Sequence, residues 1–147
     1  MIDVRFPTAI QMVLSLAVAE RKGERCTSAA LASGLGANPV LVRKLAVPLV
    51  ADGIIISSTG KNGGLRLGRS PDAITLKDVY LSVTDDKSLF TGRSDVPNVC
   101  IVSRNITNFF GEVSSGVDRV VMDQLASVTV ADSLARIEAL EEQRTGS

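Results

Sequence analysis

The residues of this sequence best suited to chemistry are two adjacent basic side chains, Arg43 and Lys44, which follow the start signal Asn38-Pro39-Val40. Asparagine caps the amides at the beginning of a helix, and proline at the first helical position loses no hydrogen bond. A guanidinium can donate two hydrogen bonds to guanine, and an ammonium can do the same or hold a phosphate. The pair therefore indicates DNA recognition, although two basic residues on a helix face are often only solvated.

A second basic group lies in a glycine-rich stretch, Gly60 to Gly64, which carries Lys61 and Asn62 and precedes Arg66. These side chains are expected to reach phosphates or the neighbouring minor groove. Glycine-rich loops also hold nucleotide phosphates, but this stretch lacks the spacing of a P-loop. The residues expected to contact DNA are Ser28, Asn38, Val40, Arg43, Lys44, Lys61, Asn62 and Arg66.

Cys26 and Cys100 are the two cysteines of the chain, which has no histidine. Histidine-activated nucleophiles and the usual zinc sites are thereby excluded from a single chain. No pair of carboxylates stands at a spacing typical of catalysis, so we expect no enzyme, no metal and no cofactor. Each thiol is a candidate redox switch, through oxidation or a disulfide. Each also fits a structural role, Cys26 as a small, partly buried residue and Cys100 at a helix start.

The elements that must position the basic residues are a pair of helices and a hairpin. Thr27 or Ser28 begins a short helix that ends at Gly36, and a second helix starts at Pro39. Apolar residues of the second helix recur on one face and leave Val40, Arg43, Lys44 and Val47 on the other. Pro48 is expected to kink this helix or end it early, because proline lacks an amide hydrogen and clashes with the preceding turn. Residues 54–56 and 65–67 are predicted strands around the glycine-rich tip, an arrangement called a wing.

Further helices are predicted on both sides of this unit. Residues 7–21 form a supporting helix, and capping-box patterns start helices at Thr75, through about Val83, and at Thr129, through about Leu140, with fraying from Glu141. From Cys100 apolar residues recur in steps of four and three, which predicts a long helix that needs a partner. Gly111 and Gly116 predict a bend or break within it. The expected dimer contacts are Val102, Ile106, Phe109, Phe110, Val113, Val117, Val120 and Val121.

Charge is distributed unevenly along the 147 residues, although the net charge is zero. Residues 1–80 carry ten basic and six acidic side chains, a net charge of +4, whereas residues 81–147 carry six basic and ten acidic ones, a net charge of −4. This division fits a basic half that contacts DNA and an acidic half that faces a partner or solvent. Apolar runs are too short for a membrane span and the N-terminus lacks the layout of a signal peptide, so we expect a cytoplasmic protein without membrane contact.

With these residues in view, the chain resembles the Rrf2 family of bacterial winged-helix transcription regulators over nearly its full length. The resemblance is carried by Asn38-Pro39-Val40 with Arg43-Lys44, Gly60 with Gly63-Gly64, Ala73 to Tyr80, Cys100 to Ile106, and Thr129 to Asp132. It implies a homodimer formed through the long helix, with each recognition helix and wing on half of a near-palindromic operator. Some members hold a two-iron two-sulfur cluster on three cysteines near the start of the long helix, where this chain has Cys100 alone. A cluster needs four ligands, so we expect none here. Other members resemble thiol-based sensors or partner-dependent repressors.

These observations predict a mainly α protein with a small β-wing. The expected division is a winged helix-turn-helix DNA-binding domain in residues 1–83, a loop in 84–99 and dimerisation helices in 100–147. The expected function is that of a homodimeric sequence-specific transcription regulator, a repressor, which binds a double-stranded DNA operator. The alternatives are a winged-helix adaptor for another protein, and a regulator whose DNA binding is switched by oxidation of Cys26 or Cys100 or by an unknown small molecule.

Overall fold

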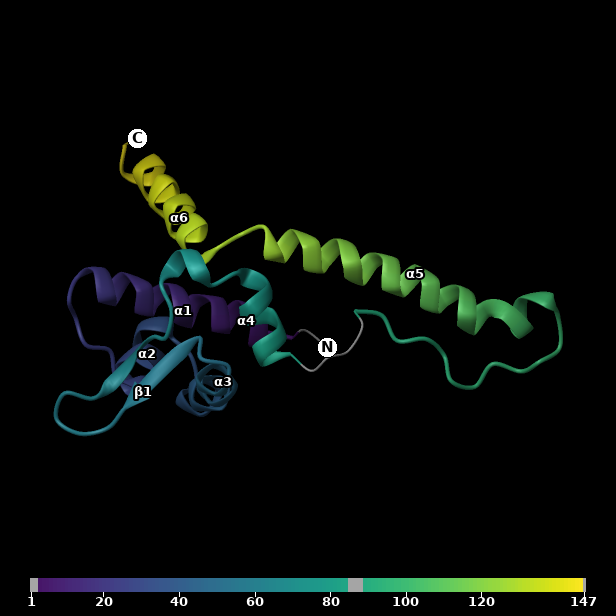
Figure 1. Cartoon of the computed structure of the whole chain (residues 1–147), viewed down its shortest axis with the longest axis horizontal. Helices are drawn as coiled ribbons and strands as arrows, with labels where there is room; N and C mark the ends of the chain where they lie inside the picture. Colours follow the sequence, from purple (N-terminus) through teal and green to yellow (C-terminus); the bar gives the residue numbers. More distant parts are fainter. Residues whose placement is uncertain (1–2, 85–88, 147) are drawn as a thin grey trace.

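The computed structural model of this chain describes residues 3–84 and 89–146 and shows a mainly helical protein with a two-stranded antiparallel sheet (Figure 1). Residues 85–88 of the predicted loop 84–99 lie outside the described residues. In chain order the elements are α1 (Arg5–Arg21), α2 (Ser28–Leu35), α3 (Pro39–Ala51), β1 (Ile55–Ser58), β2 (Gly64–Leu67), η1 (Pro71–Ala73), α4 (Leu76–Val83), α5 (Ile101–Ala126) and α6 (Val130–Thr145). Among the described residues, no helix is long and apolar enough to cross a membrane.

The helix pair begins and ends as the sequence predicts. The Thr27 hydroxyl accepts a hydrogen bond from the Ala30 amide (3.1 Å), and α2 ends at Gly36, whose φ of 63° is left-handed. The Asn38 side-chain oxygen accepts a hydrogen bond from the Val40 amide (2.9 Å) and so starts α3 at Pro39. Each capping residue satisfies an amide that the helix leaves without an internal partner.

One apolar core joins α1, α2, α3, the wing and α4 to the first turns of α6. Its largest fully buried side chains are Met12, Leu16, Leu49, Ile54, Ile55, Ile74 and Leu134. Burial of such side chains is the main favourable contribution to folding. The core therefore fixes the orientation of α3 and of the two strands relative to the rest of this body.

The last helix packs against the body rather than along α5. Thr75 and Thr129 form a β-bridge, in which the Leu76 amide donates to the Val128 carbonyl (2.9 Å) and the Val130 amide donates to the Ile74 carbonyl (2.8 Å). The side chains of Val130 and Leu134 are buried in the core, and Arg21 of α1 forms an ion pair with Glu138. The predicted division placed this helix with the dimerisation segment, whereas its first turns complete the body of the winged unit.

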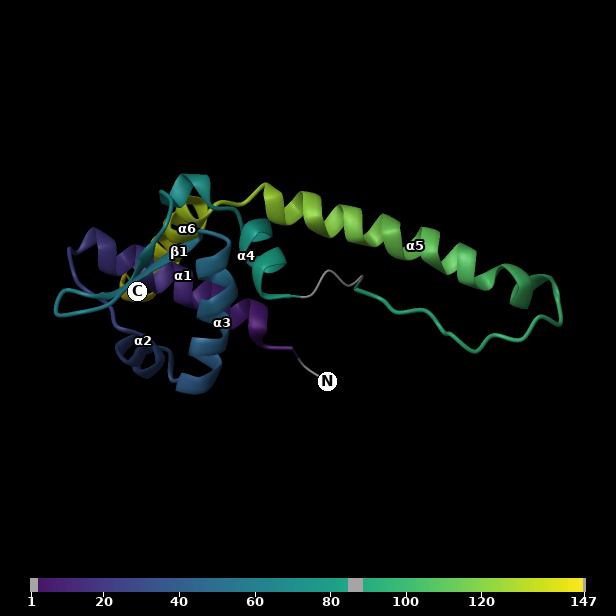
Figure 2. The ribbon, with the colours of Figure 1, turned by 60° about the horizontal axis from the view of Figure 1, so that its bottom comes forward.

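The long helix α5 extends away from the body in both views (Figures 1 and 2), and residues 89–99 run beside it. The Leu89 amide donates to the carboxylate of Asp118 (3.0 Å), and the Phe90 ring meets Phe110 edge to face, with 6.4 Å between centroids. The backbone at Gly92 passes close to the Phe110 ring, since an added Cβ would lie 3.3 Å from it. This part of the predicted loop is thus packed against the long helix.

Three helices continue where an end or a break was expected: the early end at Pro48, the break in the long helix and the end near Leu140 are wrong. The helix α3 continues past Pro48 to Ala51, because buried Leu49 holds its last turn in the core. The helix α5 runs unbroken through both Gly111 and Gly116, since the cost of about 1 kcal/mol for each glycine is small against 26 residues of helix. The helix α6 continues beyond Leu140 to Thr145. Local propensity is a weak guide wherever neighbouring turns are fixed.

Candidate nucleic-acid interface

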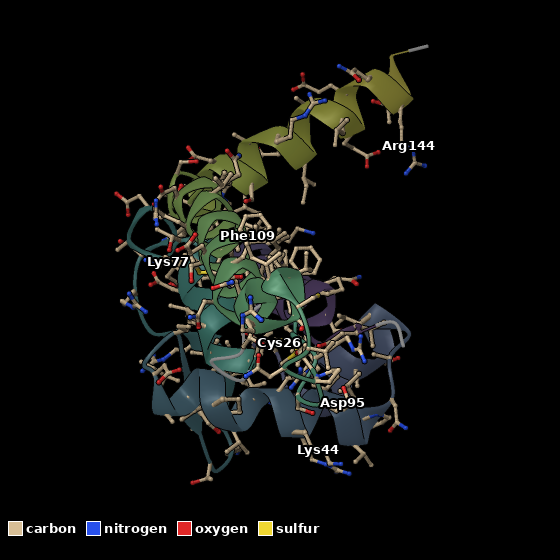
Figure 3. All side chains as sticks on the ribbon, turned by 90° about the vertical axis from the view of Figure 1, so that its right-hand side faces the viewer. Cys26, Lys44, Lys77, Asp95, Phe109 and Arg144 are labelled. Carbon is tan, nitrogen blue, oxygen red and sulfur yellow. The ribbon has the colours of Figure 1, made fainter. Side chains whose placement is uncertain are left out.

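The outer face of α3 combines basic and apolar side chains. Val40, Arg43, Lys44 and Val47 stand at helical spacing and are exposed, with Val40 at 47% and Val47 at 69% of their full exposure. Figure 3 shows Lys44 projecting outward from this helix. The range Pro39–Ala51 contains no acidic residue. In the major groove, valines can contact the methyl groups of thymine, and the basic residues between them can donate hydrogen bonds to guanine. This combination of exposed side chains suits a DNA groove better than it suits solvent.

Two residues expected to contact DNA lie at helix starts. Ser28 is the first residue of α2 and is half-buried, directly after the cap Thr27. Asn38 is exposed, but its side-chain oxygen accepts the hydrogen bond from the Val40 amide. Backbone amides at the start of a helix can bind an anion, so both positions are compatible with contact to a DNA phosphate. The side-chain oxygen of Asn38 is already used to cap α3.

The wing places three further basic or polar residues on one hairpin. The strands pair Ile55 with Leu67 and Ile56 with Arg66. Buried and exposed residues alternate along β2, whereas in β1 only Ile55 is buried. Arg66 is exposed on β2, and Lys61 and Asn62 are exposed at the tip between the strands. The structure thus brings the predicted wing residues together on the hairpin that follows α3.

The wing is joined to the link between α1 and α2, a connection that the sequence did not indicate. The Leu65 amide donates to the Cys26 carbonyl (2.7 Å), and the Arg25 guanidinium donates to the Lys61 carbonyl. An added Cβ on Gly64 would lie 2.7 Å from the Cys26 carbonyl oxygen. Gly64 is therefore required for close packing of the wing against this link. The sequence pattern gave no sign of a role for Arg25, because Arg25 lies 36 positions from Lys61.

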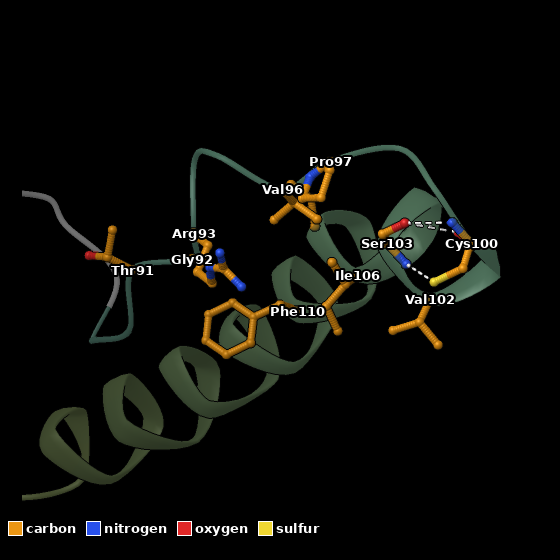
Figure 4. Close-up of a pocket in the computed structure, with 11 residues that line it drawn as sticks. Thr91, Gly92, Arg93, Val96, Pro97, Cys100, Val102, Ser103, Ile106 and Phe110 are labelled. Carbon is orange, nitrogen blue, oxygen red and sulfur yellow. Dashed lines mark hydrogen bonds between the residues drawn. The ribbon is translucent and has the colours of Figure 1, made fainter.

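The two cysteines occupy different environments. The Cys26 thiol is half-buried against the core, and this burial raises its pKa. Cys100 is exposed at the start of α5, where its sulfur accepts a hydrogen bond from the Ser103 amide (3.4 Å; Figure 4). Hydrogen bonding from that amide lowers the pKa of the Cys100 thiol. The start of α5 is the end farthest from the body (Figure 1), so one chain does not bring the two sulfurs together.

Cys100 is therefore expected to alkylate before Cys26. At a pH below the usual thiol pKa, a lowered pKa leaves more reactive thiolate at Cys100, and a raised pKa leaves less at Cys26. Brief treatment with iodoacetamide followed by peptide mass spectrometry measures both sites in one sample. Unfolding in denaturant provides the control, because it should bring the two rates close together. Faster modification of Cys26 than of Cys100 in the folded protein would contradict this expected order of reactivity.

A cavity of about 520 Å³ lies between residues 91–97 and the first turns of α5 (Figure 4). Its lining includes Val96, Pro97, Cys100, Val102, Ile106 and Phe110. Most of this lining is apolar, so the cavity continues the apolar surface of the helix start.

The eight residues expected at a dimer contact all lie on α5. Val102, Phe109, Val113 and Val120 are exposed, with Phe109 at 58% and Val120 at 69%, whereas Ile106, Phe110, Val117 and Val121 are half-buried. Phe110 is partly covered by Phe90 of its own chain. A row of exposed large apolar side chains on one helix is typical of a surface that another protein covers.

Comparisons with known proteins agree over nearly the whole chain. Residues 2–136 match a family model described as "Rrf2: Iron-dependent Transcriptional regulator". The chain is 30% identical over 132 residues to YwnA of Bacillus subtilis, named as an HTH-type transcriptional regulator, and the match covers 90% of this chain and 96% of that protein.

Solved structures share the fold. IscR of T. potens superposes with a TM-score of 0.72 at 19% identity and covers 95% of this chain and 90% of its own. CymR, described as the global cysteine regulator of B. subtilis, superposes with a TM-score of 0.65 at 20% identity, over 92% of this chain and 97% of its own. Both similarities support the arrangement of winged unit and long helix described above.

Proposed function

This chain belongs to the Rrf2 family of DNA-binding transcriptional regulators, and from that membership we propose that it is a cytoplasmic homodimeric repressor of a near-palindromic operator. The observation that carries the proposal is the outer face of α3, where Arg43 and Lys44 stand between exposed Val40 and Val47. In this proposal α3 enters the major groove and the wing reaches the adjacent backbone. The family consists of transcriptional regulators, which are not enzymes.

The proposed homodimer forms through α5. Its 26 residues span about 39 Å at 1.5 Å per residue, and its exposed apolar side chains require cover. A two-fold pairing of such helices would hold two copies of α3 at a fixed separation, as a palindromic operator requires.

The residues present do not fit the iron or iron–sulfur group that the family description implies. The whole sequence holds two cysteines and no histidine, and Cys26 and Cys100 belong to separate parts of the fold. Within residues 3–84 and 89–146, no three histidine, cysteine or acidic residues gather as metal ligands. A two-iron cluster needs four ligands, so the proposed regulator works without one.

Selection of genomic DNA fragments by the purified protein, followed by sequencing and a salt series on the best fragment, tests this function. The proposal expects a near-palindromic site with half-sites about one helical turn apart, or a multiple of it. Absence of enrichment, together with weak binding that salt abolishes, would overturn it. Such a result would favour the adaptor role, which the acidic second half of the chain also suits.

The Lys61→Ala variant is expected to weaken binding to all sequences alike and to lower the salt dependence of binding. Each lost phosphate contact reduces the slope of log K against log salt by about 0.9, hence by about two in a dimer. Titrations at four salt concentrations measure the slope. Lys77→Ala is the matched control, because Lys77 lies on α4, outside both α3 and the wing. An unaltered slope in Lys61→Ala would remove the wing contact from the proposal.

A second candidate is regulation of DNA binding through Cys100, favoured by the exposure and lowered pKa of its thiol. Cys100 lies on the proposed dimerisation helix, so an added oxygen or mixed disulfide would change the dimer contact. Mild peroxide should then lower operator affinity in the unmodified protein and in Cys26→Ser but not in Cys100→Ser. Equal affinity before and after oxidation in all three proteins would remove this candidate.

A further inference from the structure

We propose that Arg25 is a positioning residue of the wing, which holds the tip in the pose in which Lys61 meets DNA. This inference rests on the proposed DNA-binding function and adds a residue outside both the recognition helix and the hairpin. The Arg25 guanidinium donates its hydrogen bond to the backbone carbonyl of Lys61. A bond to the backbone fixes the tip without neutralising the Lys61 ammonium, which stays exposed.

The path of the Arg25 side chain is set by a glycine. Gly64 has a φ of 148°, and a Cβ added there would lie 2.7 Å from the Cys26 carbonyl oxygen and 3.3 Å from the Arg25 Cγ. The arginine stem therefore crosses the hairpin where β2 has no side chain. The bond from the Leu65 amide to the Cys26 carbonyl holds the same link against the strand. Together these contacts make residues 25–26 a brace for the wing.

The tip of the wing lies beyond the part of the hairpin that the core holds. Ile55, Leu65 and Leu67 of the strands are buried in the core, whereas Lys61 and Asn62 at the tip are exposed. A hollow of about 360 Å³ lies between the end of α1 and the wing and is lined by Glu20, Arg25, Asn62 and Arg66 among others. From the edge of this hollow the Arg25 guanidinium reaches the Lys61 carbonyl at the tip. A tip ordered before binding loses less conformational entropy when DNA arrives.

Trypsin cleavage after Lys61 tests the brace without DNA. Arg25→Ala is expected to speed this cleavage about threefold to tenfold, because the freed tip fits a protease more readily. Lys22→Ala, in the same exposed link, is the matched control and should leave the rate unchanged. The thermal midpoints of both variants should stay close to that of the parent protein. An unchanged rate at Lys61 in Arg25→Ala would overturn the inference.

A double-mutant cycle on the best operator tests the consequence for DNA. If Arg25 acts through the wing tip, Arg25→Ala weakens binding about threefold to tenfold on its own and much less in the Lys61→Ala background. If Arg25 instead contacts phosphate itself, the two losses and the two reductions in salt slope add. Additive losses would therefore overturn the positioning role. Failure of the parent protein to bind any operator would count against the proposed function, and the cleavage rates would still decide whether the brace exists.

Discussion

The Arg43→Ala variant should bind the operator far more weakly than the parent protein and should lose preference at one base pair of each half-site. A bidentate contact to guanine contributes about 1 to 3 kcal/mol of discrimination, and a homodimer loses it twice, hence about 2 to 6 kcal/mol in total. Arg43 is exposed on α3 and opposite the buried residues of that helix, so the substitution removes the contact and leaves the core intact.

Competitive titrations with operators mutated at each position measure this effect. Arg136→Ala on α6 is the control, since it removes the same charge from an exposed position outside the proposed interface. Unchanged affinity and unchanged base preference in Arg43→Ala would show that Arg43 reads no base. A loss that is equal for all sequences, with a smaller salt slope, would reassign Arg43 to phosphate.

The Phe109→Asp variant should convert the proposed dimer into a folded monomer and remove most operator affinity. Phe109 is 58% exposed in the single chain, so the body does not depend on it, whereas a carboxylate at an apolar contact between two helices is costly. Joining two DNA-binding units raises affinity about 10²- to 10⁴-fold over one unit, and this gain should disappear.

Size-exclusion chromatography with light scattering measures the mass, and operator titration measures the affinity. Asn108→Asp places the same charge one position away, outside the apolar stripe, and should remain dimeric. A Phe109→Asp protein that keeps the dimer mass and the operator affinity would exclude Phe109 from the interface. Thermal unfolding at low concentration shows whether the monomer has kept its fold.

The sequence predicts this fold well where a signal is local. Thr27, Asn38, Thr75 and Thr129 all cap helices as their side chains suggest, because a cap depends only on the three residues that follow it. The β-branched run at residues 54–56 and the glycine-rich tip likewise predict the hairpin, because both signals lie within the hairpin itself.

Contacts between distant segments could not be predicted in the same way. Arg25 and Lys61 lie 36 positions apart, and the bridge between Thr75 and Thr129 spans the whole of α5; neither pairing leaves a periodic pattern. Pro48 shows the converse error. Proline favours an early end of the helix, but α3 continues to Ala51 because Leu49 is buried in the core. Local patterns therefore predicted which elements carry the candidate residues, whereas the contact that supports the wing could not be predicted from them.

The bridge between Thr75 and Thr129 makes α5 an insertion within a folding unit rather than an appendage at its end. The chain leaves the body after α4 and returns before α6, which supplies Val130 and Leu134 to the common core. A fragment that stops at Val83 would thus lack part of its own interior, although it contains the whole helix-turn-helix and wing. Amide exchange of α6 should accordingly follow global unfolding of α1 to α4, and α5 should open on its own. In the proposed dimer, α5 is therefore a separate arm, and the core that α1 to α4 share with α6 is complete without it.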